Sequence, residues 1–140
     1  MNNCVYCNIV NHKTDDVEVF YEDNDVLVML DADWAVKGHS LVIWKQHCIN
    51  VSDLSQEEFL EFAKIYHKAE RVLLKTTNKE RAIILKTGGL VSHFHFHIYP
   101  VDNATDWQTI KAIFGKKVRY QTSPQEASDF VESLLQAMLS

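Results

Sequence analysis

The amino-acid sequence predicts an α+β fold, with an antiparallel sheet of about five strands and two or three helices. Segments rich in β-branched and aromatic residues are grouped along the chain and do not alternate strictly with helical segments. No low-complexity tract, internal repeat or Pro/Gly linker interrupts the 140 residues, a length that suits one hydrophobic core. We therefore expect a single domain over residues 1–140.

The first three strands are expected in the N-terminal third of the chain. Val17 to Tyr21 and Val26 to Leu30 are rich in residues that favour strands. The polar residues 22–25 separate the two segments, so the pair is predicted to form a hairpin. Leu41 to Trp44 follows Lys37-Gly38 and is the third predicted strand.

A long helix is expected next. Ser55 and Glu58 have the spacing of a capping box, and Leu54 with Phe59 could form the hydrophobic staple. Helical periodicity then continues to about Lys75, through the apolar residues Phe59, Phe62, Ala63, Tyr66, Ala69, Val72 and Leu73.

The last two strands follow this helix. Arg81 to Lys86 is the fourth predicted strand, and Thr87-Gly88-Gly89 ends it. The fifth lies within Ser92 to Pro100, which carries three histidines at alternate positions.

Two further helices are expected near the C-terminus. Asp106 to Phe114 predicts a short helix that ends near Gly115. The last helix begins at Pro124, with Ser123 as its cap and Glu126 completing a second capping box. Its apolar stripe consists of Phe130, Val131, Leu134, Leu135 and Met138.

Composition excludes several classes of partner. The net charge of −5 argues against an extended basic surface for nucleic acid or an anionic membrane. The longest apolar run, Val26 to Leu30, is far too short to span a membrane. The first residues show no secretory signal, and three cysteines are an odd number, so we expect a cytoplasmic protein with reduced thiols or metal ligands. Lys116, Lys117 and Arg119 could attract phosphate, although we expect them to form a solvated surface.

The histidine segment carries the main chemical signal. Side chains alternate between the two faces of a strand, so His93, His95 and His97 are expected on one face, roughly 6–7 Å apart. The residues between them are apolar and would anchor the strand to the core. Imidazole can act as nucleophile, proton donor or metal ligand, so three on one face suit an anionic group or a metal ion.

Together with Gly38 to His47 and Cys4 to Cys7, the segment His93 to Tyr99 closely resembles the histidine-triad (HIT) family. The family pattern alternates three histidines with apolar residues, and this sequence fits it at every position. An upstream glycine-histidine strand is matched by Gly38 to Ile43, and an aspartate at the end of the preceding strand by Asp31.

The resemblance implies an antiparallel α+β fold, usually as a homodimer, and nucleotide hydrolases or transferases that act on phosphorus. It implies that His95 attacks the α-phosphate and forms a covalent nucleotidyl-histidine, which water then opens. His97 would lie beside the phosphate and leaving group, and His39 would help to orient the cluster. Asp31 would accept hydrogen bonds from the ribose hydroxyls. This chemistry requires no metal.

The loop before the triad departs from the family pattern. Gly89 stands where glutamine is expected, and Leu90 where a serine or threonine is common. The backbone N–H groups of Gly88 and Gly89 could still bind phosphate. The base, the leaving group and the physiological substrate are not determined by these residues.

A structural zinc site is also expected. Cys4 and Cys7 have a spacing that lets two thiolates bind one tetrahedral ion. By the same resemblance, His47 and His93 would complete a Cys₂His₂ set. The alternative is two reduced cysteines near a flexible terminus, with His93 held by a hydrogen bond.

Two functions therefore remain open. The first is a nucleotide phosphoramidase or dinucleoside polyphosphate hydrolase that acts through a nucleotidyl-histidine. The second is a non-catalytic nucleotide- or metal-binding interaction protein on the same scaffold.

Overall fold

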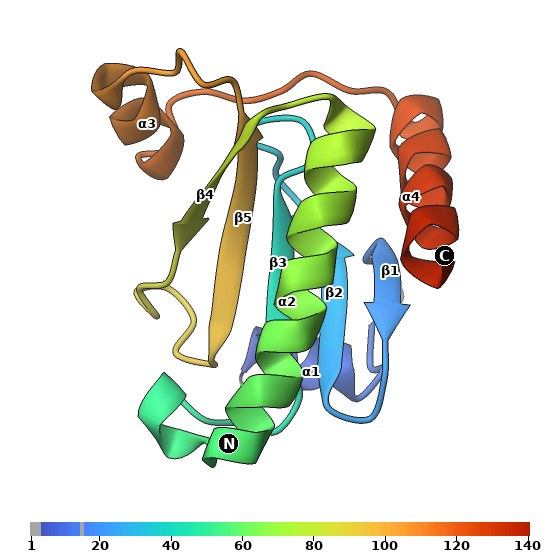
Figure 1. Cartoon of the computed structure of the whole chain (residues 1–140), viewed down its shortest axis with the longest axis vertical. Helices are drawn as coiled ribbons and strands as arrows, with labels where there is room; N and C mark the ends of the chain where they lie inside the picture. Colours follow the sequence, from blue (N-terminus) through green and yellow to red (C-terminus); the bar gives the residue numbers. More distant parts are fainter. Residues whose placement is uncertain (1–3, 15) are drawn as a thin grey trace.

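The computed structural model describes residues 4–14 and 16–140. Its centre is a five-stranded antiparallel sheet in the order β1-β2-β3-β5-β4 (Figure 1). The α+β architecture expected from the sequence is confirmed. The strands are β1 (Val19–Glu22), β2 (Val26–Leu30), β3 (Ser40–Trp44), β4 (Arg81–Leu85) and β5 (His95–Val101).

All three predicted helices are confirmed, and the described chain contains one more. The α-helices are α1 (Val5–Val10), α2 (Gln56–Thr77), α3 (Trp107–Phe114) and α4 (Pro124–Leu139), and a 3₁₀ turn, η1 (Val51–Asp53), precedes α2. The prediction of two or three helices missed α1. With only six residues, α1 is too short to show an apolar period. It begins at a cysteine cap, because the Cys4 sulfur accepts the Cys7 N–H at 3.3 Å.

Side-chain caps fix where the long helices begin. At α2, the Ser55 hydroxyl accepts the Glu58 N–H at 3.1 Å and the Glu58 carboxylate accepts the Ser55 N–H at 2.8 Å, so the predicted box is formed. At α4, Ser123 caps the helix, but Glu126 does not close the box as predicted. Its carboxylate accepts a 2.7 Å hydrogen bond from the Tyr120 hydroxyl instead.

The histidine strand begins later than its sequence pattern predicts. β5 pairs with β3 from His95 onward, opposite Ile43, and with β4 at His97, opposite Leu85. The Phe94 N–H donates to the Cys48 carbonyl at 2.7 Å, outside the regular strand. His93 therefore lies just before the regular strand, although its ring and that of His95 both lie next to Tyr6 of α1.

The two faces of the sheet are covered unequally (Figure 1). Helix α2 lies across one face, with α4 beside β1, and together they bury the main core. That core includes Phe20, Val28, Leu30, Val42, Phe62, Leu73, Phe94, Ile98, Phe130 and Leu134. On the other face the short α1 buries a smaller cluster that consists of Ile9, Val10, Leu27, Met29, Leu41 and Ile43. The histidines of β5 point to this less covered face.

A glycine fixes the approach to β3. Gly38 has a φ of +85°, a backbone conformation that L side chains rarely adopt. A Cβ there would also lie 2.9 Å from Cγ2 of Thr77. This close turn places His39 at the start of β3, facing β5. None of the described helices is long and apolar enough to cross a membrane.

Candidate functional site

Two clusters of titratable side chains lie next to each other on the less covered face. The first consists of Cys4, Cys7, His47 and His93. The second consists of Asp31, His39, His95 and His97, whose side chains are linked by short contacts. The structure therefore brings together the four metal ligands and the four polar site side chains that the sequence predicted.

The first cluster has the geometry of a tetrahedral metal site. The His93 Nδ1 lies 3.4 Å from the Cys4 sulfur, 3.5 Å from the Cys7 sulfur and 3.1 Å from the His47 Nδ1. The Cys7 sulfur lies 3.3 Å from the His47 Nδ1. Tetrahedral bonds to zinc would separate such ligand atoms by about 3.3–3.8 Å. Two sulfurs and two imidazole nitrogens therefore fit one tetrahedral ion.

His93 is held in the protonation state that a metal ligand needs. Its Nε2–H donates to the Trp44 carbonyl at 2.6 Å, so its Nδ1 presents a lone pair to the two sulfurs. Burial lowers the pKa of this imidazole and favours the neutral form. For Cys7, burial and the neighbouring Cys4 raise the pKa of the thiol, so a thiolate pair here would need a bound cation.

His95 is arranged as a neutral nucleophile. Its Nδ1 lies 2.5 Å from the His93 carbonyl oxygen, which can only accept, so the proton is on Nδ1. The Nε2 atom therefore carries the free lone pair. Burial lowers the pKa of His95, with partial opposition from that carbonyl and the Asp31 carboxylate, so the imidazole is neutral near pH 7.

His97 and His39 form a hydrogen-bonded pair. His39 Nδ1 accepts the Ala35 N–H at 3.3 Å, so its proton is on Nε2, which donates to His97 Nδ1 at 2.9 Å. Because His97 Nδ1 accepts this hydrogen bond, the proton of the neutral His97 ring is on its Nε2. Burial lowers the pKa of His97 to about 3, and the nearby His39 and His95 add to this shift. Burial also lowers the pKa of His39, against the opposing effect of Asp31.

Asp31 lies at the end of β2 beside this pair. Its Oδ1 accepts the Asp33 N–H at 2.9 Å, and its Oδ2 lies 3.6 Å from His39 Nε2 and 3.8 Å from His97 Nδ1. Asp31, His39 and His97 could be read as a second metal site from their spacing alone. The Ala35 hydrogen bond instead leaves a proton on the His39 nitrogen that faces the other two groups. This cluster is therefore built to donate hydrogen bonds.

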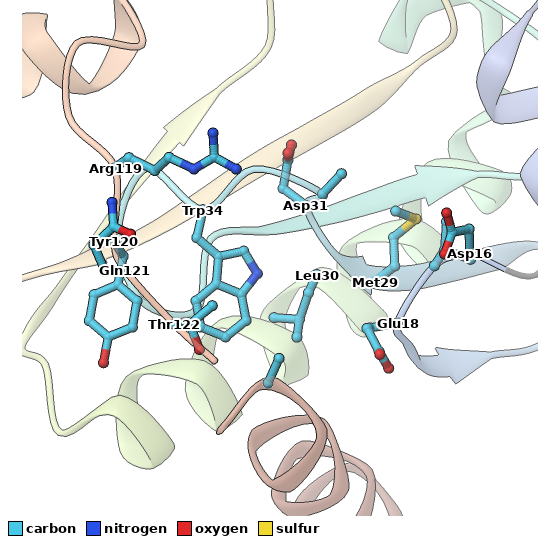
Figure 2. Close-up of a pocket in the computed structure, with 13 residues that line it drawn as sticks. Asp16, Glu18, Met29, Leu30, Asp31, Trp34, Arg119, Tyr120, Gln121 and Thr122 are labelled. Carbon is cyan, nitrogen blue, oxygen red and sulfur yellow. The ribbon is translucent and has the colours of Figure 1, made fainter. Parts of the chain in front are cut away.

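Two cavities meet at Asp31. One, of about 510 Å³, lies beside α1 and is lined by side chains including Tyr6, Ile9, Met29, Leu41 and Val91. The other, of about 590 Å³, lies beside α4 and is shown in Figure 2. There the Trp34 ring lies between the Asp31 side and the chain segment that carries Arg119 and Tyr120. The tip of β2 therefore offers space for organic groups on both sides of the carboxylate.

The loop that contains Gly88 and Gly89 was predicted to bind phosphate through its backbone N–H groups. Gly88 has a φ of +66°, and the Gly89 N–H already donates to the Thr87 hydroxyl at 3.0 Å. A phosphate could use the Gly89 N–H only if it displaced that hydroxyl. Phosphate binding by Gly88 and Gly89 therefore stays a prediction.

Two tyrosines belong to the site although the sequence pattern did not assign them to it. The Tyr6 ring meets His95 edge-on, with ring centroids 4.6 Å apart. Tyr99 stacks on His39 at 4.2 Å. Burial raises the pKa of both hydroxyls, that of Tyr99 to about 12, so the two rings stay uncharged walls. In the sequence, only the position of Tyr6 between Cys4 and Cys7 could have indicated that it lies near the site.

Comparisons with known proteins identify the family and the fold of this chain. Residues 12–104 match the family model for the HIT domain. The chain is similar to an uncharacterized HIT-like protein of Methanocaldococcus jannaschii, with 35% identity over 101 residues that cover 69% of this chain and 78% of the relative. It is also similar to an adenosine 5′-monophosphoramidase of Schizosaccharomyces pombe, with 31% identity over 105 residues that cover 71% and 75%. A zinc-bound histidine triad family protein of Mycobacterium smegmatis has the same fold, with a TM-score of 0.71, 24% identity and coverage of 98% and 94%.

The depressed pKa of His97 predicts a loss of stability in acid. The unfolded chain would protonate this imidazole near its ordinary pKa of 6.5, whereas the folded chain does so only near 3. Below pH 6.5 the unfolded state therefore binds more protons, and stability falls by about 1.4 kcal/mol per pH unit for this group. Between pH 7 and pH 5 the free energy of unfolding should fall in both proteins. We expect the fall to be smaller in His97→Gln than in the wild type, by up to about 2 kcal/mol.

Urea unfolding of both proteins at the two pH values measures this difference. His67→Gln is the matched control, because His67 is an exposed histidine on α2. If the free energy of unfolding fell equally in the wild type and in His97→Gln, the pKa of His97 would not be lowered by folding.

Proposed function

This chain belongs to the HIT domain family, and we propose that it is a nucleotide phosphoramidase or dinucleoside polyphosphate hydrolase. The proposed reaction occurs at the α-phosphate through a covalent nucleotidyl-histidine. The observation that carries the proposal is the 2.5 Å contact between His95 Nδ1 and the His93 carbonyl. It leaves the Nε2 lone pair of a neutral imidazole as the attacking atom. The similarity to an adenosine 5′-monophosphoramidase supports the same reaction class.

In the first step, the Nε2 of His95 forms a bond to phosphorus and the bond to the leaving group breaks. The leaving group departs with the electron pair of that bond and needs a proton. The His97 imidazole lies 5.0 Å from the His95 ring, between centroids, and carries a ring N–H. A bound phosphate would raise the pKa of this imidazole, because negative charge favours its protonated form. Such a positioned proton donor typically contributes about 10²–10⁴-fold in rate.

In the second step, water attacks the phosphorus and passes a proton to the His97 imidazole, which gave one up in the first step, and the bond between phosphorus and His95 breaks. The products are a nucleoside monophosphate and the free imidazole, so His95 is regenerated. The proton on His95 Nδ1 stays on that nitrogen, hydrogen-bonded to the His93 carbonyl, throughout both steps. His39 fixes the ring of His97 through the 2.9 Å hydrogen bond and is itself held by Ala35.

The nucleoside is proposed to occupy the cavity beside α1. Its wall is largely apolar and includes Tyr6, Ile9 and Met29, which suits the faces of a base. Asp31 lines this cavity and also lies beside His39 and His97, so its carboxylate could accept hydrogen bonds from ribose hydroxyls. The base would then lie near α1 and the α-phosphate near His95.

The first cluster is proposed to bind a structural zinc ion. Four protein ligands would close the coordination shell, so the ion would tie the start of α1 to β3 and to the turn before β5. Thiolate ligands must stay reduced, which agrees with the proposed cytoplasmic location. In this role the metal takes no part in the phosphoryl transfer.

A homodimer is proposed from the free edge of the sheet. Among the described strands β4 lies at one end of the order, and an edge strand can offer backbone groups to a second chain. The long apolar helix α2 offers less support, because Phe62, Ala69 and Leu73 on it are buried within the chain. The edge of β4 is therefore the better candidate for the contact between two chains.

Removal of the nucleophile should abolish turnover. We expect His95→Ala to hydrolyse neither nucleoside phosphoramidates nor dinucleoside polyphosphates, while it still binds a nucleoside monophosphate. Intact-mass analysis of quenched wild-type reactions should show a protein increased by one nucleotidyl group, and this adduct should be missing in the variant. His12→Ala serves as control, because His12 contacts Glu22 far from the triad strand in the sequence. Nucleotide binding without turnover by the wild type would favour the non-catalytic interaction protein.

Elemental analysis of the purified protein tests the proposed zinc site. We expect near one zinc per chain after purification without added metal, and loss of the zinc in Cys4→Ser and Cys7→Ser. Cys48→Ser is the matched control, because the third cysteine lies outside the ligand cluster and should leave the zinc in place. A metal-free wild type whose melting temperature does not rise on zinc addition would contradict the proposal.

The assembly is testable in solution. Light scattering at micromolar concentration should give about twice the chain mass of 16.2 kDa. A mass equal to a single chain would contradict the homodimer.

A further inference from the structure

The proposed phosphate position lacks a permanent positive charge from the residues already assigned to it. Burial lowers the pKa values of His39 and His97, so this hydrogen-bonded pair of imidazoles is neutral near pH 7. The nearest assigned charged group is the Asp31 carboxylate, which would repel a phosphate. An anionic substrate bound here therefore needs a cation from another part of the chain.

The C-terminal end of α3 supplies one. Phe114, the last residue of α3, contacts Tyr99 with ring centroids 5.7 Å apart, and Tyr99 stacks on His39 at 4.2 Å. Two residues later the chain turns at Lys116, whose φ is +57° and whose N–H donates to the Ile113 carbonyl at 3.1 Å. This stack of rings places the turn next to the histidines.

Lys116 affects the hydrogen-bonded pair of His39 and His97. Its positive charge contributes to the lowered pKa values of both His39 and His97, which agrees with the place of this turn after Phe114, whose ring contacts Tyr99. Within the described part of the chain Lys116 makes no ion pair, whereas Lys37 and Lys79 are paired with carboxylates. Its charge is therefore available to a ligand.

The segment after Lys116 is fastened across the same end of the molecule. The Arg119 guanidinium contacts the Asp33 carboxylate at 2.8 Å. The Tyr120 N–H donates to the Trp34 carbonyl at 2.9 Å, and the two rings stack at 5.8 Å. Figure 2 shows this segment beside Trp34, with the Arg119 side chain extending toward Asp31. These contacts hold the turn near the site before any ligand binds.

We propose that Lys116 binds the phosphate of the nucleotide substrate and supplies the positive charge that the neutral histidines lack. The proposal rests on the proposed function, because it concerns the same phosphate position. It also assigns a binding role to one residue of the basic cluster that the sequence suggested was a solvated surface. Lys117 is expected to have no such role, because its side chain runs back along Gly115. Its Cγ lies 3.7 Å from the position that a Cβ on Gly115 would occupy.

The test compares ligands with and without a phosphate. Calorimetric titration of the wild type, Lys116→Gln and Lys117→Gln would use the four common nucleoside monophosphates and the corresponding nucleosides. Loss of one charge-assisted contact should weaken monophosphate binding by roughly tenfold or more in Lys116→Gln. Nucleoside binding by that variant should be unchanged, and Lys117→Gln should match the wild type with both ligands. In turnover assays, Lys116→Gln should raise KM more than it lowers kcat.

Two further variants separate charge from folding. Lys116→Arg keeps the charge and should keep most of the monophosphate affinity. Lys116→Gly removes the charge but suits the positive φ, so it should fold at least as well as the wild type and still bind monophosphates weakly. Equal monophosphate affinity in wild type and Lys116→Gln would overturn the inference, and so would an equal loss for monophosphates and nucleosides. A wild type that binds neither ligand would overturn the proposed function itself.

Discussion

The hydrogen bond from His95 to the His93 carbonyl connects the parts of this site. It fixes the proton on one nitrogen of His95 and leaves the other nitrogen free to attack. The carbonyl is in place because the His93 ring is itself held, by the Trp44 carbonyl on one side and by the cysteine cluster on the other. A neutral, oriented imidazole is therefore the outcome of contacts that lie outside the phosphate position. Burial adds to this by lowering the pKa values of the neighbouring His39 and His97, which keeps both uncharged.

The helix α1 links the cysteine cluster to the proposed nucleoside cavity. A helix of six residues is too short to be stable alone, because one or two turns do not offset the cost of nucleation. Its first residues follow a cysteine of the cluster, and its later residues pack Ile9 and Val10 against the sheet. Tyr6, between the cysteines, reaches both the cavity and His95. The contacts that hold the cysteines therefore also build one wall of the cavity.

Local rules account for most of the fold. The capping box at Ser55 and Glu58 was readable because both partners lie within one turn of the chain. The five strands were readable from their composition, since buried strands need β-branched and aromatic side chains. The box at Glu126 failed because a competing partner, Tyr120, precedes the helix and captures the carboxylate. The helix α1 was missed because its stability comes from long-range contacts.

The sequence by itself determined which residue types share the site. The alternation of His95 and His97 follows from the two-residue period of a strand, and the spacing of Cys4 and Cys7 indicated a metal pair. The family resemblance added His39, Asp31, and His47 with His93 as further metal ligands. Only the tertiary structure decided how these groups are protonated and what surrounds them. The partners that fix the imidazole protons, at Trp44 and Ala35, and the turn at Lys116 come from distant parts of the chain or from backbone groups that any residue carries. No local pattern encodes such contacts, because they exist only after the sheet has closed and buried the histidines.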